Sequence, residues 1–176
     1  MTRYVALLRG INVAGQKSVK MDALKTLFTA NDFSNVATYI QSGNVFFDAA
    51  EEETGCLTQR IESMLKESLG FHVTTIVRKQ AEIEKVIAAN PYSESVTDEN
   101  LKVYVCFLSA LPEPEKIPPM KSVLVGGEDF TVIDRELYLI TPAYGNTKLS
   151  NSYIEKKLAL QSTARNWATV NKLASL

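Results

Sequence analysis

The segment Val36-Ala37-Thr38-Tyr39-Ile40-Gln41-Ser42-Gly43-Asn44-Val45-Phe46-Phe47 decides the fold, because it places two β-rich runs on either side of a short polar connection. The runs Val36–Ile40 and Val45–Phe47 flank Ser42-Gly43, where glycine can adopt the positive φ that a tight hairpin requires. The segment therefore predicts two antiparallel strands joined by a two-residue turn, Ser42-Gly43.

The sequence on both sides of this hairpin alternates between strand and helix patterns. Tyr4–Leu8 is a short β-rich run, and apolar residues recur at helical spacing from Met21 to Phe28. After the hairpin, a second helical stripe runs from Leu57 to Leu69, ends at Gly70 and leads into the strand Thr74–Val77. The first half therefore has the order β-α-β-β-α-β, which is that of a ferredoxin-like (split β-α-β) module.

The second half repeats part of this order. A short helix around Ile83 leads to the loop Asn90-Pro91-Tyr92-Ser93-Glu94, which we take as the boundary between halves. The elements that follow are a strand at Val103–Leu108, a short helix at Pro118–Leu124, a hairpin of Phe130–Ile133 with Leu137–Ile140, a helix around Ile154 and Leu158, and a last helix from Trp167. The run Tyr104–Leu108 also echoes Tyr4–Leu8.

These patterns predict an α+β protein with two ferredoxin-like modules in tandem, the second incomplete because no last strand is recognised. Each module would have an antiparallel sheet with helices on one face. The predicted modules are residues 1–90 and residues 91–176, the second with the C-terminal helix. They can also pack as one compact domain.

Size and composition indicate an ordinary globular protein. The chain has 176 residues and a mass of 19.5 kDa, and it contains no run of about 20 apolar residues that a membrane span needs. The N-terminus lacks the apolar stretch of a signal peptide, and Cys56 and Cys106 are expected to remain buried free thiols. We therefore expect a cytoplasmic protein without membrane association.

Charge is unevenly distributed along the chain. The net charge of −1 offers no global attraction for nucleic acid. Residues 1–50 nevertheless carry five Lys/Arg and three Asp/Glu, residues 51–144 nine and sixteen, and residues 145–176 five and one. Basic ends suit an anionic partner, although acidic helices that simply face solvent explain the same distribution.

Three polar strings lie at the ends of predicted elements, namely Arg9-Gly10-Ile11-Asn12, Gln41-Ser42-Gly43-Asn44 and Arg165-Asn166-Trp167. In a ferredoxin-like sheet the first and third strands are antiparallel neighbours, so the end of one lies beside the start of the other. We therefore expect the first two strings to share one rim of the sheet. The topology does not fix the position of the third string.

The loop Gly10–Ser18 comes close to a phosphate-binding P-loop, but Gln16 interrupts the glycine-lysine pair. A P-loop also belongs to a mainly parallel sheet, whereas these strands pair as hairpins, so a Walker-type NTPase is not predicted. A glycine-containing loop with Arg9 and Lys17 before a helix N-terminus still suits an anion. The alternative is that the glycines only permit the turn and that the basic side chains are solvated.

The third string, Arg165-Asn166-Trp167, is predicted to lie at the start of the last helix. If Thr163 caps this helix, Arg165 and Asn166 lie in its first turn and Trp167 faces the core. A cation there opposes the helix dipole unless an acidic partner or an anionic ligand compensates it. Arg165 is therefore a candidate ligand-binding residue, and an internal salt bridge is the alternative.

Several kinds of chemistry are not indicated. His72 is the only histidine and has no cysteine close in sequence, so neither a Cys/His metal site nor a serine-histidine triad is predicted, and no cofactor is implied. Tyr4, Phe46 and Phe47 fall on central strands, as the base-stacking residues of RNA-recognition sheets do. The ribonucleoprotein motif is absent and the chain is acidic, so core packing is the preferred interpretation and a nucleic-acid partner is not favoured.

The strings Leu7–Val13, Tyr39–Val45 and Ala164–Trp167 with Thr169-Val170 and Lys172-Leu173 together resemble the bacterial family called domain of unknown function 1697. Members of that family usually have two glycines after the Ile-Asn-Val string, where this chain has Ala14-Gly15. The resemblance implies two related ferredoxin-like modules. It implies no activity, because the family is uncharacterised.

The leading hypothesis is that the protein binds a small anionic ligand, such as a nucleotide or phosphate ester, at the basic polar rim. The candidate residues are Arg9, Asn12, Lys17, Gln41, Ser42 and Asn44, with Lys148, Arg165 and Asn166 as additions. A second hypothesis is an acyl- or phosphoryl-transfer enzyme, in which Arg9 holds the phosphoryl group and Asn44 positions water. A third is a module whose rim binds protein or nucleic acid. The sequence indicates neither the identity of the anion nor the oligomeric state.

Overall fold

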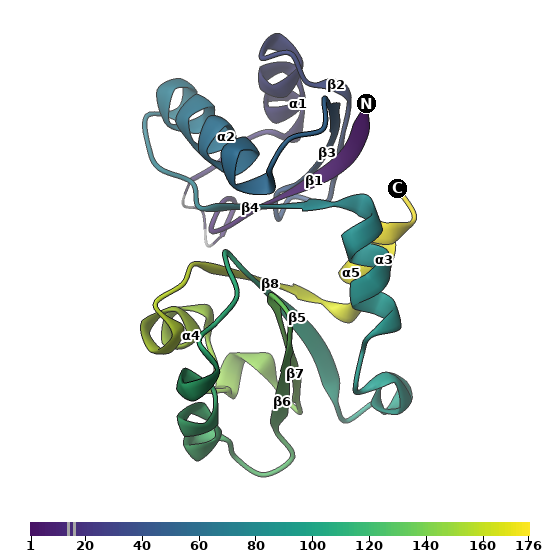
Figure 1. The fold of residues 1–176 in the computed structure, drawn as a ribbon, viewed down its shortest axis with the longest axis vertical. Helices are drawn as coiled ribbons and strands as arrows, with labels where there is room; N and C mark the ends of the chain where they lie inside the picture. Colours follow the sequence, from purple (N-terminus) through teal and green to yellow (C-terminus); the bar gives the residue numbers. More distant parts are fainter. Residues whose placement is uncertain (14, 16) are drawn as a thin grey trace. The chain divides into compact units, whose positions relative to one another are not determined.

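The computed structural model describes residues 1–13, 15 and 17–176, and its chain divides into two compact units (Figure 1). The first unit contains Met1–Ile83 together with Leu176, and the second contains Glu84–Ser175. The units divide within the helix that follows the first sheet, whereas the sequence analysis placed the division after residue 90.

The first unit is a complete ferredoxin-like module. Its elements are β1 (Thr2–Leu8), α1 (Met21–Ala30), β2 (Ser34–Tyr39), β3 (Asn44–Ala49), α2 (Thr54–Leu69) and β4 (Thr75–Lys79), followed by α3 (Gln80–Ala88), in which the units divide. The sheet order is β2-β3-β1-β4, and every neighbouring pair is antiparallel. The element order predicted for this half is therefore confirmed.

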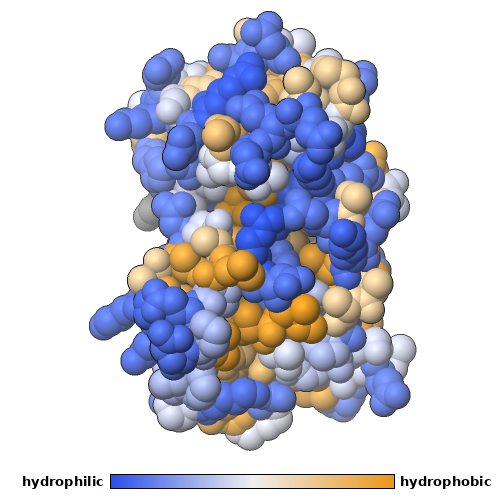
Figure 2. Space-filling view, in the orientation of Figure 1, coloured by the Kyte–Doolittle hydropathy of each residue, from blue (hydrophilic) through white to orange (hydrophobic). Residues whose placement is uncertain are grey.

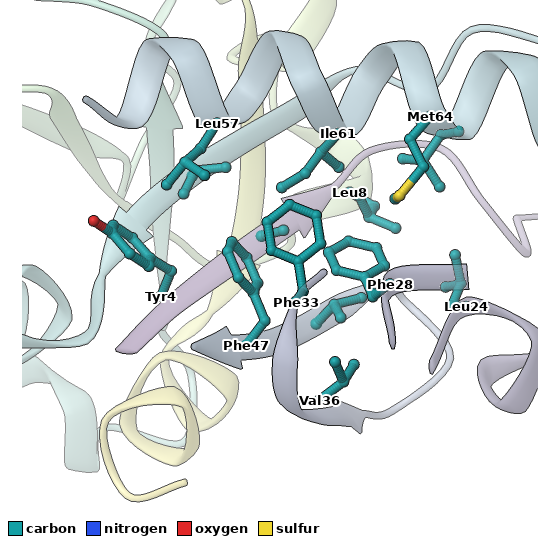
Figure 3. Packing of buried hydrophobic residues seen from close by; sticks show 14 of the residues in the cluster. Tyr4, Leu8, Leu24, Phe28, Phe33, Val36, Phe47, Leu57, Ile61 and Met64 are labelled. Carbon is teal, nitrogen blue, oxygen red and sulfur yellow. The ribbon is translucent and has the colours of Figure 1, made fainter. Parts of the chain in front are cut away.

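Helices α1 and α2 cover one face of this sheet (Figure 1). Alternate residues of β1, such as Tyr4 and Leu8, belong to the same buried cluster as Leu57 and Ile61 of α2, and Figure 3 shows these side chains meeting a group of phenylalanines. Among these phenylalanines, Phe33 and Phe47 have ring centroids 4.7 Å apart in an edge-on arrangement. Burial of each such side chain stabilises the fold by about 1.5–3 kcal/mol.

The second unit has the same sheet order with different connections. Its elements are η1 (Ser93–Thr97), β5 (Lys102–Leu108), η2 (Pro114–Lys116), η3 (Pro118–Val123), β6 (Asp129–Ile133), β7 (Glu136–Thr141), η4 (Tyr144–Asn146), α4 (Asn151–Leu158), β8 (Ser162–Asn166) and α5 (Trp167–Ala174). The strands are ordered β6-β7-β5-β8, and all pairs are antiparallel. Two 3₁₀ helices replace the α-helix that connects the first two strands of the first unit.

The strand β8 corrects the prediction that the second module lacks its last strand. Residues Ser162, Thr163 and Arg165 are buried although they are polar, so the segment has none of the apolar alternation that identifies a half-buried strand. Thr163 consequently lies inside a strand and does not cap the last helix. The cap is Asn166, whose side chain accepts a hydrogen bond from the Thr169 N–H at 2.8 Å.

The echo between the two halves corresponds to equivalent positions in the two sheets. Val5 pairs with Arg78 in the first sheet, and Val105 pairs with Arg165 in the second. In both units a helix follows this last strand directly. The Leu8 N–H donates to Gly43 O and the Leu108 N–H donates to Arg135 O, in each case over 2.8 Å.

The second unit has its own core behind β5. Alternate residues Cys106 and Leu108 form a buried cluster with Met120, Ile154 and Leu158. Burial raises the pKa of the Cys106 thiol to about 12, so this thiol stays protonated at neutral pH. Both cysteines are free as expected, but Cys56 is exposed on α2 and not buried.

Figure 2 shows mainly hydrophilic residues on the visible face of the first unit, and apolar residues gathered over β5 and β8 of the second.

None of the helices in the described part of the chain combines the length and the apolar character needed to cross a membrane.

The connection between β2 and β3 is longer than predicted and depends on one glycine. The sequence suggested a two-residue turn, but Tyr39 pairs with Asn44, so four residues, Ile40–Gly43, make the connection. Gly43 has φ +80°, and a Cβ built there would lie 2.8 Å from both Leu8 Cβ and Ile11 Cδ1. The position therefore requires glycine for its backbone conformation and for space.

We predict that Gly43→Ala lowers the free energy of unfolding by about 3 kcal/mol or more, because a left-handed conformation costs about 1–2 kcal/mol and overpacking adds about 1–3 kcal/mol. Urea unfolding monitored by circular dichroism measures this loss. Gly70→Ala is the matched control, because Gly70 has nearly the same φ of +79° but open space around its Cβ position. Equal losses in both variants would contradict the proposed steric role of Gly43.

Candidate functional site

The first two polar strings meet at one edge of the first sheet. Leu7 pairs with Asn44, and the Leu8 N–H donates to Gly43 O over 2.8 Å. Farther along, Asn12 Nδ2 donates to the carbonyl of Gln41 at 3.0 Å. These contacts confirm that the strings lie side by side. We call the loop 9–20 and the turn Ile40–Gly43 together the rim.

Asn12 holds the loop of the rim closed. Its Nδ2 also donates to Val19 O at 2.9 Å, its Oδ1 accepts from the Val19 N–H at 2.8 Å, and its own N–H donates to Lys17 O at 3.1 Å. Asn12 has φ +54°, a left-handed conformation that asparagine tolerates better than most residues. Because its amide is fully engaged inside the protein, Asn12 shapes the loop and its side chain has little left to offer a ligand.

Asn44 has a similar role in the turn. Its side chain is completely buried, and Nδ2 donates to Tyr39 O at 3.0 Å and to Ser42 Oγ at 3.2 Å. Within this turn Ile40 has φ +50°, which is rare for a β-branched side chain, and it remains 47% exposed. Asn44 and Ser42 therefore fix a strained turn.

The basic side chains occupy the outer part of the loop. Lys17 Nζ donates to the carbonyl of His72 at 3.1 Å and lies 5.5 Å from the centroid of the Phe71 ring. Arg9 is partly exposed, and its N–H donates to Thr74 O at 2.9 Å. Lys20 is exposed and occupies the N-cap position of α1, where no side chain caps the helix. The first acidic residue of the chain is Asp22, so no carboxylate within the loop itself offsets these charges.

The other three candidate residues belong to the second unit. Lys148 is exposed in the loop before α4, and Asn166 is the N-cap of α5. Arg165 is only 7% exposed, and its Nη1 donates to Thr163 Oγ1 at 2.8 Å and to Ala164 O at 2.9 Å. Desolvation lowers the pKa of its guanidinium to about 10, so Arg165 stays charged at neutral pH. The prediction that Arg165 opposes the dipole of the last helix was wrong, because Arg165 lies in β8.

Arg78 is a buried arginine that the sequence analysis did not single out. It occupies in β4 the place that Arg165 occupies in β8, is 1% exposed, and donates from Nη1 to the carbonyl of its preceding residue, Val77, at 3.1 Å. Arg165 binds the carbonyl of Ala164 in the same way. The sequence signal for this pair is the similarity of Tyr4–Leu8 to Tyr104–Leu108. Equivalent residues of these two strands pair with Arg78 and with Arg165.

Among the described residues, no group of three or more His, Cys, Asp or Glu side chains is placed to hold a metal ion. His72 Nε2 lies 4.0 Å from Glu62 Oε1, and the same carboxylate oxygen accepts the Thr75 N–H at 2.8 Å. The comparison of the loop with family members at Ala14, and with a P-loop at Gln16, falls on residues outside the described part of the chain.

The family model described as "Protein of unknown function (DUF1697)" matches residues 1–138. The chain belongs to this family. The structure of this DUF1697 protein is similar to that of a conserved bacterial protein from Streptococcus pneumoniae, with a TM-score of 0.77 and 21% sequence identity over 99% of this chain and 97% of that chain. At this identity the similarity shows a shared fold alone. No curated protein sequence matches the chain.

The Asn12 contacts generate a prediction for the DUF1697 chain. Asn12→Asp keeps an acceptor for the Val19 N–H but replaces the two Nδ2 donations with a carboxylate facing two carbonyl oxygens. We predict a loss of about 1–3 kcal/mol in the free energy of unfolding at pH 7, because a partly buried and an exposed carbonyl oxygen lose their donor and the new carboxylate faces both.

The same repulsion raises the pKa of the introduced carboxyl in the folded state, so protonation favours folding of the variant. The loss relative to wild type should therefore shrink as the pH falls through that raised pKa. Urea titrations at pH 4 to 8 measure this dependence, with the exposed Asn146→Asp as the control. A loss that does not change with pH would contradict the assigned contacts.

Proposed function

We propose that this DUF1697 protein binds a small anionic ligand, such as a nucleotide or phosphate ester, at the rim of its first unit. The observation that carries the proposal is the loop 9–20, which joins three cations to the N-terminus of α1 without a side-chain cap. Backbone N–H groups at a helix N-terminus attract anions, and the helix dipole adds partial positive charge.

The residues divide into those that shape the site and those that contact the ligand. Asn12, Ser42 and Asn44 hold the loop and the turn through internal hydrogen bonds. Arg9 and Lys17 supply charge, and the exposed side chain of Gln41 supplies an amide donor. Lys148, Arg165 and Asn166 remain predicted contributors, and the proposal does not depend on them.

Backbone strain at the rim supports a functional role. Asn12, Lys17 and Ile40 all have positive φ values between +46° and +54°. Such conformations in non-glycine residues cost of the order of 1 kcal/mol each and persist where the surrounding structure enforces them, often at ligand sites. Four described non-glycine residues outside the rim share this conformation, so strain accompanies the proposed site without defining it.

The geometry disfavours the role that the acyl- or phosphoryl-transfer hypothesis gives to Asn44. That hypothesis required Asn44 to position water, but the buried Asn44 amide donates to Tyr39 O and Ser42 Oγ. No other observation favours bond cleavage at the rim, so we propose binding without assigning a reaction.

We further infer that the protein acts in the cytoplasm of a bacterium. Two free cysteines, one of them exposed, suit a compartment in which thiols stay reduced. The similar fold of a conserved bacterial protein supports the bacterial origin.

We predict that orthophosphate, pyrophosphate, ATP or a sugar phosphate raises the thermal unfolding temperature of the wild-type protein. A ligand at 100 times its dissociation constant adds about 2.7 kcal/mol, which is roughly 5–10 °C for a chain of this size. Lys17→Gln should weaken the binding about tenfold, because a charge close to a solvated anion contributes on the order of 1 kcal/mol or more.

Lys25→Gln is the matched control, because Lys25 is exposed on α1 outside the rim and its loss removes the same net charge. If both variants weakened ligand binding equally, only the net charge would matter, and the proposed binding site at the rim would be contradicted. If no phosphate compound shifts the unfolding temperature, a rim that binds a macromolecule, using exposed Val13 and Ile40, becomes the better account.

A further inference from the structure

A cavity of about 340 Å³ lies within the second unit, and none of the residues of the rim lines it. It is lined by Val96 of η1, by residues Leu101–Tyr104 at the start of β5, and by residues Asn166–Ala168 where β8 leads into α5. The start of β5 contacts both η1 and α5, so the cavity walls come from packed elements. Its volume falls within the range of natural small-molecule sites.

The walls of the cavity are mainly apolar and partly aromatic. The lining includes the aliphatic residues Val96, Leu101 and Val103 and the aromatic residues Tyr104 and Trp167. The Tyr104 ring is held by a stack on Tyr144, with centroids 4.2 Å apart and planes inclined by 29°. Aromatic walls of this kind favour a flat ring, which gains by stacking.

Two polar side chains in the lining, those of Lys102 and Asn166, offer hydrogen-bond donors. Lys102 Nζ donates one hydrogen bond to the carbonyl of Glu99 at 3.2 Å, which leaves two of its N–H groups for a ligand. Asn166 uses its Oδ1 to accept the Thr169 N–H, and its Nδ2 has no hydrogen bond to another described residue. Trp167 and Ala168 are the first residues of α5, whose leading N–H groups have no partner within the helix.

The charge at this end of α5 favours an anionic group. The first turn of the helix has no acidic residue, so the dipole is not already compensated there. The acidic residues Glu94, Asp98 and Glu99 are close in sequence, but none of them lines the cavity. Asp98 Oδ1 also accepts the Asn100 N–H at 2.8 Å. Lys102 is therefore the charged side chain in the lining.

From these observations we propose that the cavity binds a small aromatic carboxylate. The aromatic ring lies against Trp167, and the carboxylate accepts hydrogen bonds from Lys102, from Asn166 Nδ2 and from the N-terminus of α5. The site shares no residue with the rim. It gives Asn166, a candidate from the sequence, a place in a defined cavity.

The chain has a single tryptophan, so the indole Nε1–H of Trp167 gives one distinct cross-peak in a ¹H–¹⁵N spectrum of the full-length protein. Titration with phenylacetate should move this peak along a saturable curve. Phenylacetamide, which has the same shape without the charge, should bind about tenfold more weakly or worse. An unmoved peak at about 10 mM phenylacetate, where even a ligand of millimolar affinity occupies most sites, would overturn the proposal.

Two substitutions separate the assigned contacts from general effects. Lys102→Gln should weaken phenylacetate about tenfold and leave phenylacetamide nearly unchanged, whereas Lys172→Gln, exposed near the other end of α5, should change neither. Ala168→Leu adds volume at an exposed lining residue and should weaken both compounds. Equal affinity for acid and amide in wild type, or an equal effect of Lys102→Gln and Lys172→Gln, would overturn the carboxylate assignment.

Discussion

The hydrogen bond from the Leu8 N–H to the Gly43 carbonyl joins the end of β1 to the turn between β2 and β3, and the geometry of the rim depends on it. It brings the loop 9–20 beside the turn, where Asn12 adds a bond to Gln41 O. Gly43 has no room for a Cβ against Leu8 and Ile11. Packing and hydrogen bonding therefore fix the two polar strings together before any ligand is present.

The second unit shows that this architecture does not require a basic loop. The Leu108 N–H donates to Arg135 O across the corresponding junction, over the same 2.8 Å. The segment that follows β5 contains Glu113 and Glu115, and Lys116 pairs with Glu113 at 2.9 Å. The same fold thus forms with an acidic connection in one unit and a basic one in the other. The charge of the rim is therefore not a requirement of the fold.

The sequence predicted the fold well where apolar periodicity matched burial. The first module and the meeting of the Arg9–Asn12 and Gln41–Asn44 strings followed from the order of elements alone. The strand β8 was missed because Ser162, Thr163 and Arg165 are buried by virtue of their hydrogen bonds and pairing, which composition does not reveal.

The sequence predicted where the site lies but not what each of its residues does. An asparagine looks the same in the sequence whether its side chain faces a ligand or the backbone. Only the structure shows that the amides of Asn12 and Asn44 donate to carbonyl oxygens of the loop and the turn. The positive φ of Ile40 runs against its intrinsic preference, so no local rule predicts it. Trp167 was expected in the core, but it is half-buried and lines a cavity that forms only when η1, β5 and α5 pack.

Amide hydrogen exchange at Leu8 and Val19 tests most directly whether the rim is preformed. Both N–H groups donate inside the protein, to Gly43 O and Asn12 Oδ1. The account predicts that, without ligand, both amides exchange at least about 100-fold more slowly than in an unfolded chain, as expected for hydrogen bonds that open only through local unfolding. Exchange of the Val19 amide at the unfolded rate would contradict it, because the loop would then not be held closed by Asn12.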